Sequence, residues 1–169
     1  MKRGVLLFTR KKCIIILNLI LIIVNINCSK SNGSCLAFTT YDHYFVKNTF
    51  HVDSTGCFLE IHDTASFDSV FSAAATMEKN TWIVSSDFRD NCVISVIKDF
   101  GNNNYDLKIK KVCLYGSSIR IDYDYKLIEK NLSYSSTGNA IAMIKNQSHK
   151  MIKFYENGIF IKQISILNH

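Results

Sequence analysis

Hydrophobic and polar side chains alternate without interruption from Ile119 to Leu127. Isoleucine, tyrosine and leucine occupy the odd positions, and charged residues occupy the even ones. Successive side chains of a strand point to opposite faces of a sheet, so this two-residue period predicts a strand with one buried face and one face in water. A further strand is expected over residues 140–145.

Two segments near the C-terminal end are predicted to pair as a hairpin. Residues 151–156 and 159–166 flank Asn157-Gly158, and this dipeptide favours the left-handed backbone that a type I′ turn requires. Shorter strands are expected earlier in the chain, at one or two places in 36–52, at 56–62 and at 82–84.

One helix is predicted, over residues 64–75, with a loop after it at 77–80. Asp63 and the residues next to it offer side-chain oxygens that can cap the helix N-terminus. Apolar residues then recur at the spacing of one helical face, at Phe67, Val70, Phe71 and Ala74. With six to eight strands, most of them antiparallel, and one main helix, the chain is predicted to have an α+β fold dominated by antiparallel β-sheet.

A second hairpin is predicted in the middle of the chain. Residues 92–98 and 105–114 flank the glycine- and asparagine-rich segment 101–104, which is typical of a turn. If the two strands pair symmetrically about this turn, Cys92 lies directly opposite Cys113. Directly opposed residues have Cβ atoms about 4.5–5.5 Å apart, close to the range of a disulfide.

The hairpin therefore predicts a Cys92–Cys113 disulfide, and exclusion then pairs Cys35 with Cys57. An even set of four cysteines fits an exported protein in an oxidising compartment. The alternative is that these cysteines are reduced and pack as small buried hydrophobic residues.

Residues 1–27 have the features of a bacterial export signal. Basic residues precede an apolar run at 13–24, which is shorter than the roughly 20 residues that a membrane-spanning helix needs. Cys28 follows and is the predicted lipid-attachment site of a lipoprotein. The alternatives are a plain secreted protein and an uncleaved N-terminal anchor. The division that follows is a signal peptide (1–27), a lipidated cysteine with a polar tether (28–35) and a single domain (36–169).

The formal net charge of +6 arises mainly in the signal peptide. It holds five of the 20 basic residues and none of the 14 acidic ones. The chain from Cys28 onward therefore has 15 basic and 14 acidic residues, and they form no polybasic run. Recognition of nucleic acid needs a clustered basic face, so a nucleic-acid partner is not expected.

Signatures of catalysis and cofactor binding are not found in the sequence. It has no phosphate-binding glycine-rich loop, nucleophile elbow or zinc-protease helix. None of the histidines pairs with another histidine or cysteine at the spacing of a structural zinc site. Asp122 and Asp124 share a strand face, but neighbouring basic residues favour a solvated surface over acid–base catalysis. We therefore expect no catalytic residue, metal or cofactor.

Residues 59–145 resemble a known family in the order of their segments: LEIHDTASFDSVF, an alanine-rich loop that ends at Met77, SSDFRDNCVISVIKD with its Asp87-Phe88 step, and YDLKIKKVCLYGSSIRIDYDYK. This order is similar to that of the PrcB-like C-terminal domain, a family of small bacterial lipoproteins associated with a protease complex. The resemblance implies a role in binding or stabilising another envelope protein and supplies no catalytic residue.

The leading expectation is a non-enzymatic protein of the bacterial cell envelope that binds a partner protein, with a protease complex as the partner that the resemblance implies. Its lipid would anchor it to a membrane, the outer membrane being favoured over the inner one. One alternative is a periplasmic carrier or sensor of a small ligand, with a concave sheet lined by Tyr41, Phe45, Tyr123 and Tyr125. A secreted protein of unknown activity and an enzyme whose site assembles from distant residues are the others.

Overall fold

The structure is a computed structural model that describes residues 33–74 and 82–166. The predicted signal peptide, Cys28 and the predicted loop at 77–80 lie outside the described residues. Within them, two sheets and a short two-stranded ribbon account for eleven strands, joined by one α-helix and one 3-10 helix.

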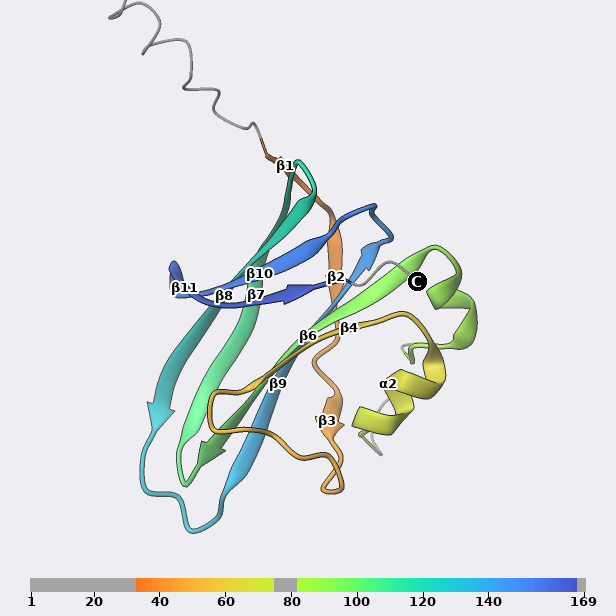
Figure 1. Ribbon diagram of the computed structural model, residues 1–169. Coiled ribbons are helices and arrows are strands. Elements are labelled where there is room, and N and C mark those ends of the chain that lie inside the picture. The colour runs from red at the N-terminus through yellow and green to blue at the C-terminus, as the bar shows by residue number, and fades with distance from the viewer. Residues whose placement is uncertain (1–32, 75–81, 167–169) are drawn as a thin grey trace, which may run out of the picture. The chain divides into compact units, whose positions relative to one another are not determined.

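The larger sheet has five strands and the smaller has four (Figure 1). In spatial order, the larger contains β1 (Ser34–Cys35), β7 (Asn104–Tyr115), β8 (Ser118–Glu129), β10 (Met151–Glu156) and β11 (Ile159–Ser165). The smaller contains β2 (Phe38–Thr40), β9 (Ser136–Lys145), β6 (Asn91–Gly101) and β4 (Cys57–Ile61). All pairings in these sheets are antiparallel except that of β8 with β10.

The main hydrophobic core lies between the two sheets. Ile119, Ile121 and Tyr123 of β8 face it, as the alternation in the sequence predicts. The smaller sheet supplies the opposite side, with buried side chains that include Cys92, Ile94, Val96, Ala142 and Ile144. Burial of this apolar surface is the main favourable contribution to the stability of the fold.

A second core lies on the other face of the smaller sheet. Here β3 (Tyr44–Val46), β5 (Phe71–Ala73), α2 (Thr64–Val70) and η2 (Ser85–Arg89) cover that face. Figure 1 shows α2 and β3 on the side of the smaller sheet away from β7 and β8. Strand β6 is consequently buried on both faces, which explains why its sequence is a continuous apolar run and does not alternate.

The helix begins where the sequence predicts and ends earlier. Asp63 caps it, because Asp63 Oδ1 accepts a hydrogen bond from the Ser66 N–H at 2.8 Å. Phe67 and Val70 are buried as expected. The prediction of a helix to residue 75 was wrong, because the backbone of Phe71 is extended and β5 pairs with β3.

Several strand predictions are confirmed and two are corrected. Strands at 56–62, 119–127 and 140–145 and the C-terminal hairpin are present, and the sheet-dominated fold class is confirmed with more strands than six to eight. Residues 82–84 form no strand. The predicted hairpin of 92–98 with 105–114 was wrong, because β6 and β7 follow each other across a tight turn but belong to different sheets.

The C-terminal hairpin turns at Asn157-Gly158, and both residues have positive φ angles, 49° and 86°. The side chain of Asn157 also bonds the neighbouring strand. Its Oδ1 accepts from the Tyr125 N–H at 3.1 Å and its Nδ2 donates to the Tyr125 carbonyl at 3.0 Å. The turn is thereby tied to β8, alongside the parallel pairing of β8 with β10.

Candidate functional site

Strand β11 forms an open edge of the larger sheet (Figure 1). Three consecutive large apolar residues on it are exposed: Ile159 at 68%, Phe160 at 51% and Ile161 at 39%. An edge strand presents backbone N–H and C=O groups that no neighbour uses, and natural proteins usually protect such edges with charges or proline. β11 has one charged residue, Lys162, after its three exposed apolar residues. The apolar part of this edge is suited to pairing with another strand.

The outer face of the sheet continues this surface inward from the edge. The Phe160 ring contacts the Tyr155 ring edge-on, with centroids 5.5 Å apart. The guanidinium of Arg120 lies 3.9 Å from the centroid of Tyr155 and is held in place by Asp122, 2.6 Å away. A hollow of about 290 Å³ adjoins Arg120 and Tyr155. We call β11 together with Arg120 and Tyr155 the edge surface.

A second polar cluster lies at one end of the core between the sheets. Glu60 of β4 faces this core with only 4% of its side chain exposed, and His149, in the loop between β9 and β10, is equally buried. The Nε2 atoms of His149 and of His62 each lie 3.2 Å from Glu60 Oε1. Cys92, at the start of β6, is fully buried beside Glu60 and His62. We call these four residues the Glu60 cluster.

The thiol of Cys92 is not an activated nucleophile. Burial, and then the carboxylate of Glu60, raise the pKa of Cys92 to about 12. A reactive cysteine needs a lowered pKa and a positive neighbour. The thiol is therefore protonated at neutral pH, and nucleophilic catalysis at Cys92 is disfavoured.

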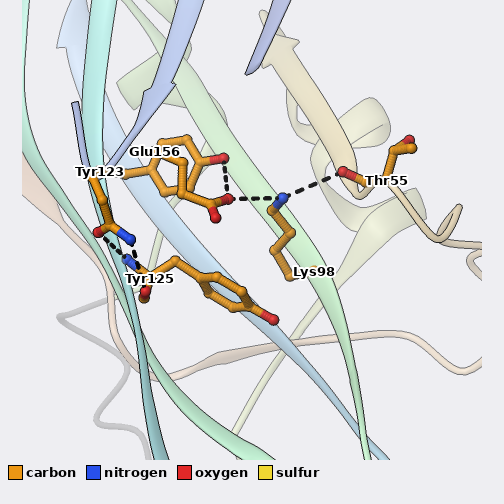
Figure 2. A network of polar contacts seen from close by, with 6 residues as sticks. Thr55, Lys98, Tyr123, Tyr125 and Glu156 are labelled. Carbon is orange, nitrogen blue, oxygen red and sulfur yellow. Dashed lines mark hydrogen bonds and ion pairs between the residues drawn. The ribbon is translucent and has the colours of Figure 1, made fainter. Parts of the chain in front are cut away.

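At the other end of the same core, Lys98 forms an ion pair with Glu156 (Figure 2). The Tyr123 hydroxyl donates to Glu156 Oε2 at 2.9 Å, and the Lys98 ammonium donates to the Thr55 carbonyl at 3.3 Å. The ammonium also lies 5.5 Å from the centroids of Phe58 and Tyr125, within the range of cation–π attraction. These contacts join the sheets and close that end of the core.

The predicted disulfides were wrong. Cys113 is bonded to Cys35, whereas Cys57 and Cys92 are free thiols. Cys35 on β1 lies opposite Cys113 on β7 in the same sheet, and Cys57 belongs to the other sheet.

A β-bulge explains the error for Cys113. The pairing of β7 with β8 shifts between Ile109 and Lys111, so the side-chain alternation inverts there. Val112 consequently faces the core, and Cys113 faces the opposite side of the sheet, away from Cys92. The predicted lipid-attachment residue, Cys28, lies outside the described residues.

Other residues singled out in the sequence have ordinary structural partners. Asp122 pairs with Arg120, and Asp124 lies 3.6 Å from Lys110, so the two aspartates form a salt-bridged surface. Tyr123 is 1% exposed in the core, and Tyr125 stacks on Tyr105 with centroids 4.3 Å apart.

A groove of about 320 Å³ lies elsewhere, and its lining contains no aromatic residue: Thr40, Asp42, Leu107, Lys108, Ile109, Lys110, Ala140 and Ile141. Phe45, which was expected in the aromatic lining of a carrier, borders a different hollow of about 440 Å³ together with Phe50. Tyr123 and Tyr125 are not part of the lining of either hollow.

Within residues 33–74 and 82–166, no helix has both the length and the apolar character needed to cross a membrane. Comparisons of the chain with protein-family models, with curated proteins and with solved structures find no match. The resemblance to the PrcB-like C-terminal domain stays a prediction.

Proposed function

We propose that this protein is a non-enzymatic, lipid-anchored envelope protein that binds an extended segment of a partner protein at the edge surface. The observation that carries the proposal is the run of three exposed apolar residues, Ile159 to Ile161, on an edge strand of the larger sheet. Peptides bind such edges by adding a strand, whose backbone hydrogen bonds provide affinity while side-chain contacts provide specificity.

The composition of the edge surface supports a protein partner. Aromatic residues and arginine are enriched at the centres of protein interfaces and carry much of their binding energy. Tyr155, Phe160 and Arg120 lie together here, and Arg120 is already positioned by Asp122. Less ordering of Arg120 is therefore required when a partner binds.

The predicted lipid would hold the domain at a membrane, where envelope partners are found. Cys28 precedes β1 in the sequence by a few residues of polar tether. The resemblance to protease-associated lipoproteins makes a protease complex the first partner to examine.

The test is site-specific photo-crosslinking in cells. A benzophenone amino acid replaces Phe160 in the edge surface or, as a matched control, Tyr134, which is also an exposed aromatic residue at 61%. We expect one dominant crosslinked protein from position 160 and none from position 134, and Ile161→Lys should remove the crosslink. Equal crosslinking from both positions, or an adduct of twice the mass of this chain, would contradict the proposal.

Lipid anchoring has its own test. Cys28→Ala should abolish incorporation of labelled palmitate and move the protein from the membrane to the soluble fraction. Label retained by that variant would contradict the anchor without affecting the edge surface.

A further inference from the structure

The Glu60 cluster contains buried polar atoms that the folded chain leaves unsatisfied. Both carboxylate oxygens of Glu60 and Nε2 of His149 are buried and make no hydrogen bond, although Nε2 and Oε1 are only 3.2 Å apart. A buried carboxylate that accepts no hydrogen bond is costly. A carboxylate oxygen and an imidazole nitrogen that face each other without a hydrogen bond suggest a further group bound to both.

Three of the side chains, Glu60, His62 and Cys92, come together because of the register of β4 on β6. Ile61 pairs with Val93, and the next step of this register places His62 beside Cys92. Glu60 shares the inner face of β4 with His62, and the ligand atoms of Glu60, His62 and Cys92 lie within 4.8 Å of one another. His149 reaches the same carboxylate from the loop before β10.

The tautomer of His149 is suited to metal binding. Its Nδ1 lies 2.8 Å from the Gln147 carbonyl, which can only accept a hydrogen bond, so Nδ1 carries the proton. This leaves Nε2, which faces Glu60 of the cluster, as the nitrogen available to bind a metal. Metal-bound histidines usually have this arrangement, with the second nitrogen donating to a carbonyl or carboxylate.

The donor atoms and spacings favour zinc. One thiol, two imidazoles and one carboxylate supply the ligand types that Zn²⁺ binds in tetrahedral sites. With bonds of about 2.0–2.1 Å, neighbouring ligand atoms of a tetrahedron are about 3.3 Å apart. The two nitrogen–oxygen distances to Glu60 Oε1, both 3.2 Å, match this value.

From these observations we propose that Glu60, His62, Cys92 and His149 bind one Zn²⁺ ion. The thiol proton of Cys92 leaves to solvent when the Zn–S bond forms. His62, with 56% of its side chain exposed, lies at the mouth of the site and gives the ion a route inward. All four ligands come from the protein, which is typical of a structural site and leaves no open position for catalysis.

The experiment uses the full-length chain, purified in detergent without a histidine tag, stripped with a chelator and titrated with Co²⁺. Cobalt is a spectroscopic substitute for zinc that shows a thiolate charge-transfer band and the visible bands of a tetrahedral site. We expect one equivalent to bind, Zn²⁺ to displace it, and the melting temperature to rise by roughly 10 °C at a hundredfold excess of Zn²⁺ over Kd.

Variants separate this site from other thiols and histidines. Cys92→Ser should remove the thiolate band, and His149→Gln should weaken binding at least tenfold. The matched controls are Cys57→Ser, at the other free thiol, and His51→Gln, at a histidine whose side chain is 91% exposed. Both should bind like the wild type.

The proposal is overturned if the wild type shows no thiolate–cobalt band or if the band persists in Cys92→Ser. Because buried variants can unfold, His62→Gln provides a second test at a half-exposed position. It should keep the melting temperature of the metal-free protein and bind Co²⁺ at least tenfold more weakly. Unchanged affinity in that variant would also count against the site.

Discussion

Lys98 Nζ lies 3.0 Å from Glu156 Oε2, and this ion pair joins β6 of the smaller sheet to β10 of the larger one. The side chains are only 12% and 20% exposed. Removing one partner of a pair with so little access to water leaves the other charge uncompensated. Each charge is therefore stable in this position only while the other is present.

We expect Lys98→Met and Glu156→Gln each to lower the free energy of unfolding by about 2–3 kcal/mol. The double variant has neither charge, and the amide that replaces the Glu156 carboxylate still offers an acceptor to Tyr123, so it should be more stable than either single variant. Urea unfolding of the four proteins measures this. Simply additive losses in the double variant would show that the charges do not depend on each other.

The tyrosines beside this pair predict a loss of stability at alkaline pH. Burial, and then the neighbouring Tyr105, raise the pKa of Tyr125 to about 12, above its ordinary value of 10. Between these values the unfolded chain releases a proton that the folded chain keeps. Stability from this group is therefore complete below pH 10 and falls as the pH rises toward 12.

Tyr125→Phe should reduce this loss of folding stability with rising pH. Part of it should remain, because burial and the hydrogen bond to Glu156 also raise the pKa of Tyr123. Urea midpoints between about pH 10 and 12 provide the measurement, with the exposed Tyr134→Phe as control. An identical pH profile for Tyr125→Phe and the wild type would refute the prediction.

Breaking the Cys35–Cys113 disulfide should destabilise the domain. The bridge spans 78 residues, and the chain-entropy estimate for a loop of this length is about 4 kcal/mol. Cys35→Ser should lower the urea midpoint accordingly, whereas Cys57→Ser, at a free thiol, should have a small effect. Non-reducing peptide mapping that links Cys113 to Cys92 would show that this pairing is incorrect.

A glycine is required at position 138 because the Phe100 ring lies against it, and not because of its backbone conformation. A Cβ atom at this position would overlap the ring of Phe100, which is 8% exposed in the core. Gly138→Ala should therefore cost about 1–3 kcal/mol from overpacking. In a Phe100→Leu background the same change should cost much less, and an undiminished penalty there would point to another cause.

Features determined by neighbouring residues could be predicted from the sequence. The alternation of β8, the turn at Asn157 and the Asp63 cap each depend on signals within a few residues. The end of α2 could not be predicted in this way. Phe71 continues the helical spacing, but its pairing with Val46 of β3 determines its conformation.

The disulfide and the Glu60 cluster depend on long-range pairing. A bulge in β7 places Cys113 on the opposite face of the sheet from the one that simple alternation predicts. The sequence of β7 gives no recognised signal for this bulge. The cluster combines residues 60, 62, 92 and 149, and this separation matches no metal-binding motif. Only the His62–Glu60 spacing is local, and the register of β4 on β6 is needed to add Cys92.

The side chain of Asn157 bonds the backbone N–H and C=O of Tyr125 as another strand residue would. Exposed turns usually tolerate insertions, because nothing outside the turn depends on their length. Here one extra residue in the turn would move the side-chain amide of Asn157 away from the Tyr125 backbone on β8. The tip of this hairpin is therefore a poor place to insert a tag or a reporter domain, although it lies at the surface.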